Sequence, residues 1–207
     1  MMKAFFEKYP YIKHVIFFFI IYMTLFLLLE HRNSYVYYTT DSWIDNYIPF
    51  CEYFVIPYLL WFVYIFLGFV YFIFIDQSGF QRTCFYLFTG MLTCLLIYFV
   101  FPNQQNLRVE LANTNIFQCL VSFIYSVDSP TNVCPSIHVY NSLMMMITLQ
   151  KSQHIQQHHY LSIINVIIAI LICISTIMIK QHAFIDLVFA VIFSIVIYQI
   201  GKWKFHY

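Results

Sequence analysis

Residues 54–75 read FVIPYLLWFVYIFLGFVYFIFI, and this stretch contains no charged side chain. A helix crosses the hydrocarbon core of a bilayer in about 20 residues, so the stretch predicts a membrane-spanning helix. Four further apolar runs have a suitable length, and they lie at 14–29, 84–101, 160–179 and 183–200. A sixth run, 138–149, is shorter and includes Asn141 and Ser142. It indicates either a short span or a helix buried inside the bundle. We count it as a span, because only then do the loops and termini orient consistently.

The composition excludes a soluble protein. Of the 207 residues 62% are hydrophobic and only 9% are charged, whereas soluble domains carry about 25% charged residues. The net charge of +1 leaves no basic patch for a nucleic acid, so no such partner is expected. No repeat or linker divides the chain. We therefore predict one all-α membrane-embedded domain over residues 1–207, a bundle of six transmembrane helices whose first helix is not cleaved as a signal peptide.

The basic residues predict the orientation, because Lys and Arg are enriched in cytoplasmic loops. With six spans and a cytoplasmic N-terminus, most basic residues lie inside: Lys3, Lys8, Lys13, Arg82, Lys151, Lys202 and Lys204. Three lie outside, namely Arg32, Arg108 and Lys180. Both termini are then cytoplasmic, and the plasma membrane is the expected location. The amphipathic segments 35–53 and 109–127 are expected to lie along the outer interface.

Cysteines and inner histidines leave two alternatives open. Cys51, Cys119 and Cys134 fall in predicted outer segments, where a disulfide is conceivable, although no spacing supports a particular pair. The inner loop holds His154, His158 and His159, and two of them are four residues apart. That spacing suits a metal ion, but no acid or cysteine accompanies the histidines, so a solvated loop is favoured.

Ionisable residues beside membrane spans are candidates for function, because they are expensive there. His182 and Asp186 are four residues apart and share one face of a helix. The carboxylate can then orient the imidazole and leave its other nitrogen free, as in an activated nucleophile or a general base. The alternative is a His–Asp pair that only fixes the end of a helix.

A second cluster precedes the short sixth run. Pro135 suits the first turn of a helix, and the amides of Ser136, Ile137 and His138 would then converge at a helix N-terminus, a natural anion site. His138 has the proton affinity for acid–base chemistry near neutral pH. The alternative is a helix cap with an interfacial histidine.

Two cations are predicted on the same face as these clusters. Arg108 offers a bidentate grip on phosphate, and Lys180 offers a point charge. The alternative for each is a side chain that snorkels to the interface. The coincidence of two histidines, a carboxylate, two cations and a helix N-terminus on one side favours chemistry on a phosphate.

These residues resemble the type 2 phosphatidic acid phosphatase superfamily, whose site is shared with vanadium haloperoxidases. Pro135-Ser136-Ile137-His138 resembles the family's Pro-Ser-Gly-His motif, with Ile137 in place of glycine. The segment from Ser175 through His182 to Asp186 keeps the spacing of the motif Ser-Arg, five residues, His, three residues, Asp, but Thr176 replaces its arginine. In the remaining motif, Arg108 stands for the arginine, Val109 replaces proline and Phe101 replaces lysine. The resemblance covers about residues 101–190.

The resemblance implies a metal-independent lipid phosphatase that acts at the outer membrane face and needs no cofactor. By this resemblance His182 attacks phosphorus, Asp186 holds its ring and His138 protonates the departing lipid oxygen. The phosphate oxygens would be bound by Arg108, Lys180, Ser136 and Ser175, and we hypothesise that Lys180 restores the charge missing at Thr176.

Two other functions remain open. One is a phosphotransferase of the sphingolipid-synthase type, which would pass the phospho-headgroup to a lipid alcohol instead of water. The other is a non-catalytic lipid-binding or transport protein that uses the same scaffold. The identity of the lipid and the oligomeric state are not predicted by the sequence.

Overall fold

The computed structural model describes residue 9 and the segments 11–32 and 36–205, and it is all-α apart from one pair of two-residue strands. Its helices are α2 (Tyr11–Glu30), α3 (Val55–Phe74), α4 (Gln77–Val100), α5 (Ile116–Val127), α6 (Ile137–Gln150), α7 (Gln153–Gln157), α8 (His159–Met178) and α9 (Phe184–Phe205). Lys3, Lys8 and Tyr35 belong to the predicted topology but lie outside the described residues.

Five helices of the described chain are long and apolar enough to cross a membrane, namely α2, α3, α4, α8 and α9. Each corresponds to one of the five longer predicted runs. The largest differences in length are at α4, which begins at Gln77 although its run begins at 84, and at α9, which continues to Phe205. Both extensions carry polar or basic residues that a hydropathy run leaves out. The protein is therefore a helical membrane protein.

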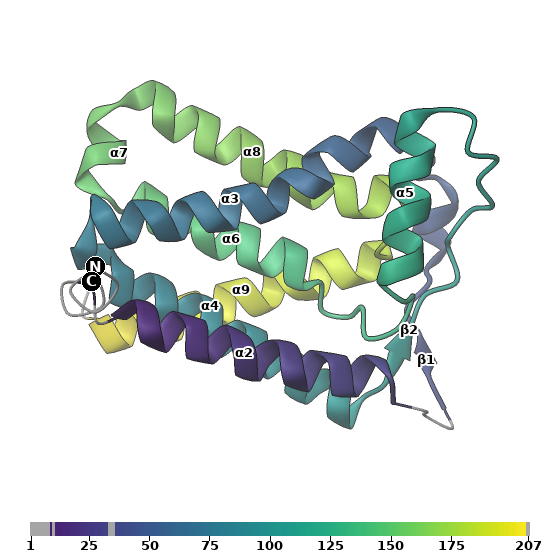
Figure 1. Cartoon of the computed structure of the whole chain (residues 1–207), viewed down its shortest axis with the longest axis horizontal. Coiled ribbons are helices and arrows are strands. Elements are labelled where there is room, and N and C mark those ends of the chain that lie inside the picture. Colours follow the sequence, from purple (N-terminus) through teal and green to yellow (C-terminus); the bar gives the residue numbers. More distant parts are fainter. Residues whose placement is uncertain (1–8, 10, 33–35, 206–207) are drawn as a thin grey trace, which may run out of the picture.

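The sixth run forms α6, which occupies the centre of the bundle (Figure 1). It packs against α3, α4, α8 and α9. Asn141 and Ser142 are buried among these helices and not exposed to lipid. With 14 residues and a rise of 1.5 Å each, α6 is about 21 Å long, shorter than a hydrocarbon core of about 30 Å. The expectation of a helix buried in the bundle is thus met, while five helices have the length of a full span.

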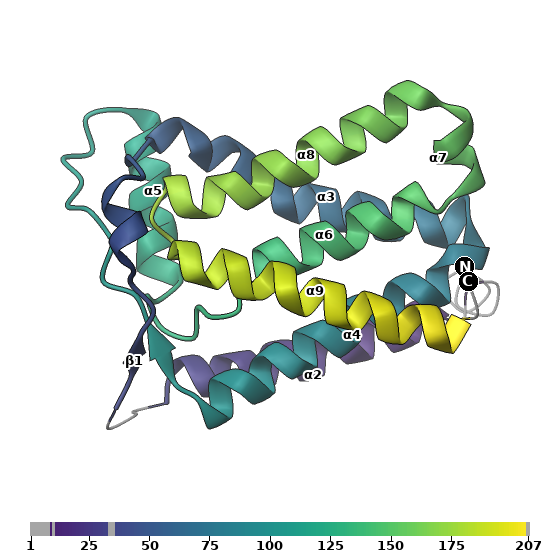
Figure 2. The same ribbon diagram turned by 180° about the vertical axis from the view of Figure 1, so that it is seen from behind.

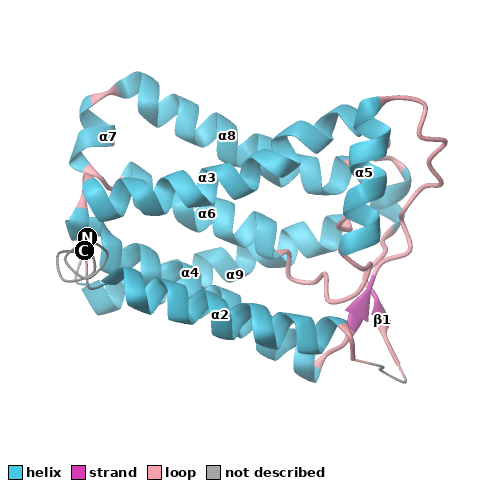
Figure 3. Ribbon diagram, viewed as in Figure 1, coloured by secondary structure: helices cyan, strands magenta, loops and turns pink. Residues whose placement is uncertain are grey.

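The two ends of the bundle differ. The N-terminal end of α2 and the C-terminal end of α9 lie at one end, together with α7 (Figures 1 and 2). Helix α5 and the longer loops lie at the opposite end, where α5 crosses the bundle (Figure 3). Here the strands β1 (Tyr38–Thr39) and β2 (Asn103–Gln104) pair in parallel. We call this the α5 end of the bundle.

Glycines allow the central helix to approach its neighbours. A Cβ added to Gly90 of α4 would lie 1.9 Å from the ring of Tyr140 on α6, and the Tyr140 hydroxyl donates a hydrogen bond to the carbonyl of Tyr86. A Cβ added to Gly68 of α3 would lie 2.3 Å from the sulfur of Met145, also on α6. Both glycines therefore serve the close packing of α3 and α4 on α6.

Two short 3₁₀ helices, η1 (Trp43–Asn46) and η2 (Glu52–Phe54), precede α3 at the α5 end. The amphipathic segment 109–127 contains α5, in which Asn115 caps the first turn by accepting a hydrogen bond from the amide of Gln118. All six cysteines are free, so the disulfide left open by the sequence is not formed.

Candidate active site

Three segments distant in the sequence meet at the α5 end of the bundle. They are the start of α6 with His138, the turn between α8 and α9 with His182, and the first turn of α9 with Asp186. The amide of Ser136 donates a hydrogen bond of 3.2 Å to the carbonyl of Asp186, which fixes the start of α6 against the start of α9. The predicted catalytic residues are therefore brought together.

Asp186 lies behind the His182 ring. Its carboxylate is fully buried, and Oδ2 accepts a hydrogen bond of 2.8 Å from the amide of Ala183. This bond from the residue before α9 to the third residue of α9 is one half of a capping box. The same oxygen lies 3.5 Å from Nδ1 of His182, which is too long for a good hydrogen bond. Nδ1 of His182 and Oδ1 of Asp186 are both buried without a hydrogen-bond partner. Asp186 thus faces one nitrogen of the His182 ring.

The rings of His138 and His182 lie next to each other. Their ring centroids are 5.8 Å apart, with an angle of 59° between the ring planes. Aromatic residues of α3 surround His138: its ring centroid lies 4.7 Å from that of Tyr58 and 4.4 Å from that of Trp61. The indole nitrogen of Trp61 is buried without a hydrogen-bond partner. The two imidazoles are in ring contact, so both can reach neighbouring atoms of one small polar group.

Arg108 reaches the site from the loop after α4. Its guanidinium donates hydrogen bonds to the carbonyls of Tyr125 and Asp128 and to the side chain of Gln181, the neighbour of His182. The Nε donor is buried without a partner. Burial lowers the pKa of Arg108, and Asp128 opposes this shift, so the guanidinium stays charged. Arg108 therefore contacts the neighbour of His182, and its part in binding phosphate stays a prediction.

Lys180 lies in the predicted turn between α8 and α9, but its side chain bonds to backbone carbonyls. Its ammonium group donates to the carbonyls of Asp45 and Ile48, at 3.0 and 2.6 Å. The backbone of Lys180 is left-handed (φ 55°), as expected for the residue that follows a helix C-cap. The side chain therefore holds the turn of η1 and is not directed at a phosphate beside the histidines. The hypothesis that it replaces the missing arginine gains no support from its contacts.

The two serines of the predicted phosphate site are also engaged. The Ser175 hydroxyl is buried and donates to the carbonyl of Ile172 within α8. Ser136 is buried, and its hydroxyl caps α6 by accepting a hydrogen bond from the amide of Val139. Because the Ser136 amide is bonded to Asp186, it is not one of the free amides expected at the start of α6. Ile137 and His138 supply the amides that remain at this helix end.

Sequence reasoning missed Asp128 as a site residue. One of its carboxylate oxygens accepts a hydrogen bond of 2.9 Å from Gln181, and Arg108 bonds to its carbonyl. Burial raises the pKa of Asp128, and the nearby His182 lowers it. The only signal in the sequence is an acid seven residues before Pro135, which is too weak to distinguish it from a surface residue.

Asn103 was missed as well, although it builds the loop before α6. Its side-chain oxygen accepts hydrogen bonds from the amides of Val133 and Cys134, and its side-chain nitrogen donates to the carbonyl of Cys134. The Tyr98 hydroxyl donates to the carbonyl of Pro135. These bonds tie the loop that precedes His138 to the end of α4.

Within the described part of the chain, no group of three or more His, Cys, Asp or Glu side chains is arranged to hold a metal ion. His154 and His158 lie with ring centroids 4.8 Å apart at the end of the bundle opposite to the site. No family model, curated protein or solved structure matches the chain.

Proposed function

We propose that this protein is a lipid phosphatase that hydrolyses a phosphate monoester or diphosphate of a membrane lipid through a phosphohistidine intermediate. The observation that carries the proposal is the meeting of His138, His182 and Asp186 at one end of a membrane-embedded bundle, with the two rings 5.8 Å apart. If the only role of the His182–Asp186 pair were to fix the start of α9, no second histidine would be needed beside it.

The chemistry divides between the two histidines. Nε2 of His182 attacks phosphorus, and the bond between phosphorus and the lipid oxygen breaks. The positive charge that develops on the ring is stabilised by Asp186. His138, which must be protonated when the substrate binds, gives its proton to the departing oxygen. A monoester then releases a lipid alcohol, and a diphosphate releases a lipid monophosphate. Water then attacks the phosphohistidine, the phosphorus–nitrogen bond breaks, and His138 takes the proton of that water as phosphate is released.

Charge on the phosphoryl oxygens needs donors that are already in place. We assign this role to Arg108, whose guanidinium donates a hydrogen bond to Gln181, the neighbour of His182. The amides of Ile137 and His138 at the start of α6 add to it. Lys180 holds the segment of η1, Ser136 caps α6, and Ser175 bonds within α8, so their contacts favour structural roles.

We also propose how the chain is oriented in the membrane. If α6 counts as a short sixth span, the chain passes along the bundle an even number of times, and both termini lie on one side of the membrane. The positive-inside rule assigns that side to the cytoplasm. The site would then face outward, in the plasma membrane.

The test is phosphate release by the purified protein from a panel of lipid phosphates and diphosphates in mixed micelles. His182→Ala should abolish release, and His154→Ala, at the opposite end of the bundle, should leave it unchanged. Trapping of a ³²P-labelled, acid-labile protein adduct in the wild type and its absence in His182→Ala would support the intermediate. Equal release by His182→Ala and wild type would refute the proposal.

Two additions to the assay separate the rival chemistries. Phosphate release in water without an acceptor lipid supports hydrolysis, whereas product that appears only after a lipid alcohol is added indicates a phosphotransferase. Activity should persist in EDTA, because cations and amides of the chain neutralise the phosphate. Loss of activity in EDTA and its return with added metal would contradict that mechanism.

A further inference from the structure

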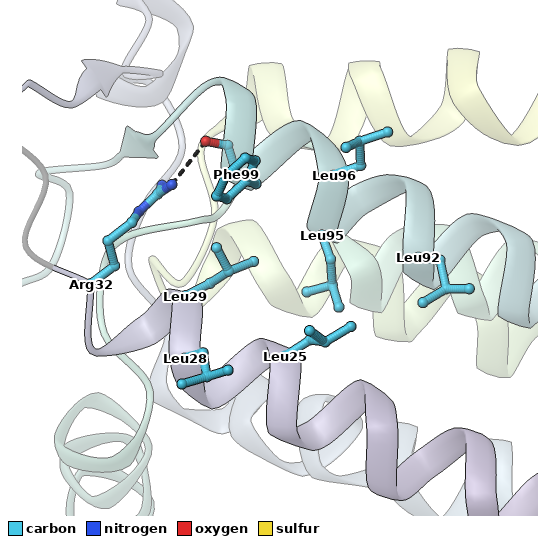
Figure 4. Close-up of a pocket in the computed structure, with 8 residues that line it drawn as sticks. All are labelled: Leu25, Leu28, Leu29, Arg32, Leu92, Leu95, Leu96 and Phe99. Atoms are coloured by element: carbon cyan, nitrogen blue, oxygen red, sulfur yellow. Dashed lines mark hydrogen bonds between the residues drawn. The ribbon is translucent and has the colours of Figure 1, made fainter.

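A groove separates α2 from α4 near the α5 end of the bundle (Figure 4). Its volume of about 410 Å³ falls in the range of small-molecule binding sites. The groove has apolar walls and one charged residue at its end, and it is lined by Leu25, Leu28, Leu29, Arg32, Leu92, Leu95, Leu96 and Phe99.

The groove exists because the packing of α2 on α4 changes along their length. Nearer the other end the two helices are joined by stacked rings of Phe18 and Phe88, with centroids 3.7 Å apart. Toward the α5 end both helices present leucines, which are smaller than these rings and line the groove (Figure 4). Leu95 is buried and forms the floor, whereas Leu28 and Leu96 are 65% and 60% exposed.

Arg32 lies where the groove meets the end of α4. Its guanidinium donates hydrogen bonds of 2.8 Å to the carbonyls of Tyr98 and Phe99, which end the helix. Among the described residues no carboxylate lies within ion-pair distance of Arg32, and its Nε is buried without a partner. Carbonyls satisfy some of its five N–H donors but do not neutralise its charge.

We propose that this groove binds an anionic phospholipid, with one acyl chain between α2 and α4 and the phosphate against Arg32. The walls suit a hydrocarbon chain, and the cation without a counter-ion suits a phosphate at the level where the helices end. The acyl chain of any lipid can fill an apolar groove that faces the bilayer, so the groove by itself does not select a headgroup. The preference for an anionic headgroup therefore depends on Arg32. A basic residue near a membrane surface favours an anionic lipid about fivefold.

The lipid would lie in the same leaflet as the candidate active site, because the groove and the site share the α5 end. The two are nevertheless different places. The groove lies on the α2 face of α4, and the histidines lie between α3, α6 and α9. The inference does not depend on the proposed phosphatase activity, and a protein without such activity could still bind this lipid.

The test compares phosphatidylglycerol with phosphatidylcholine of identical acyl chains, added to the purified full-length chain in an uncharged detergent. Bound lipid is counted by native mass spectrometry. We expect the wild type to retain phosphatidylglycerol about fivefold better than phosphatidylcholine. Arg32→Gln should remove this preference, and Arg32→Lys should keep part of it.

A second pair of variants tests the groove itself. Leu96→Trp fills it from a position that already faces outward, so the fold should persist while retention of both lipids falls. The matched controls are Ile195→Trp, an exposed position on α9, and Lys202→Gln, an exposed basic residue at the opposite end. Neither control should change lipid retention or selectivity.

Two results would overturn the proposal. One is equal retention of the two lipids by the wild type, or an unchanged preference in Arg32→Gln. The other is a protein that dimerises in detergent and is made monomeric by Leu96→Trp, because the groove would then hold a second copy of the chain.

Discussion

The carboxylate behind His182 allows the sharpest test of the site. In Asp186→Asn the side chain keeps its size, and its oxygen can still accept the hydrogen bond from the amide of Ala183. What is lost is a negative charge 3.5 Å from Nδ1 of His182. At an effective dielectric constant of about 20, a charge pair at this distance interacts by about 5 kcal/mol. Because the ring is neutral before attack and positive afterwards, this energy stabilises the transition state more than the ground state.

The expected result is a fall in kcat of about three to four orders of magnitude with little change in KM, since each tenfold in rate corresponds to about 1.4 kcal/mol. The assay is phosphate release from the best lipid of the panel, together with a thermal unfolding curve of each variant. Asp45→Asn is the matched control, because Asp45 is also buried and also accepts a hydrogen bond from an amide of this turn, that of Phe184. It should lower stability while kcat stays within about fivefold. A folded Asp186→Asn protein with wild-type kcat would refute the electrostatic role of Asp186.

Three further predictions concern packing, charge and the loop contacts. Gly90→Ala should destabilise the protein by about 1–3 kcal/mol, because the added methyl group meets the Tyr140 ring, which is hydrogen-bonded and cannot move aside. Gly68→Ala should destabilise it less, because the methyl group there meets the flexible end of Met145. Equal unfolding midpoints for the two variants would contradict this reasoning. Burial raises the pKa of Asp128 in the folded protein, so the folded state holds this proton more tightly than the unfolded state does. The resulting stabilisation is fully present below the unfolded-state pKa of about 3.9. It is lost as the pH rises through the higher folded-state pKa. Asp128→Asn should therefore gain stability relative to wild type between pH 4 and pH 7, and a constant difference in midpoint across that range would show that the shift is absent. Lys180→Met should lower the free energy of unfolding by about 1–3 kcal/mol, because two backbone carbonyls lose their hydrogen-bond donor. The KM for the lipid should change less than threefold. A large rise in KM at unchanged stability would instead indicate that Lys180 binds phosphate.

The spans were predictable because each follows from the length of one apolar run. Residues 54–75 and 160–179 differ from α3 and α8 by a single residue at each end. The start of α4 at Gln77 was not predictable in this way, since Asp76 caps the helix through the amide of Gly79 and lets it begin in a polar stretch. Helix caps depend on local hydrogen bonds that a hydropathy average does not register.

In the candidate site, the sequence predicted what local spacing determines. The four-residue interval brings His182 and Asp186 together, although not on one helix face as predicted, because His182 lies in the turn before α9 and only Asp186 is in the helix. Ser136 caps α6, whereas Pro135 precedes the cap and does not take the first helical position. The sequence could not predict the direction of Lys180, because the left-handed backbone after α8 turns that side chain toward η1. Nor could it find Asp128, whose role arises only where the loop before α6 meets the turn after α8.

The short central helix has a consequence for how the protein enters the membrane. Helix α6 is not among the helices of the described chain that are long and apolar enough to insert by themselves. Two of the helices it packs against, α8 and α9, are synthesised after it. We expect α6 to remain outside the hydrocarbon during synthesis, or at its edge, until the helix pair α8–α9 provides a protein surface for Asn141 and Ser142. The candidate site, whose His138 lies in the first turn of α6, would then be assembled last, in the step that completes biogenesis of the bundle.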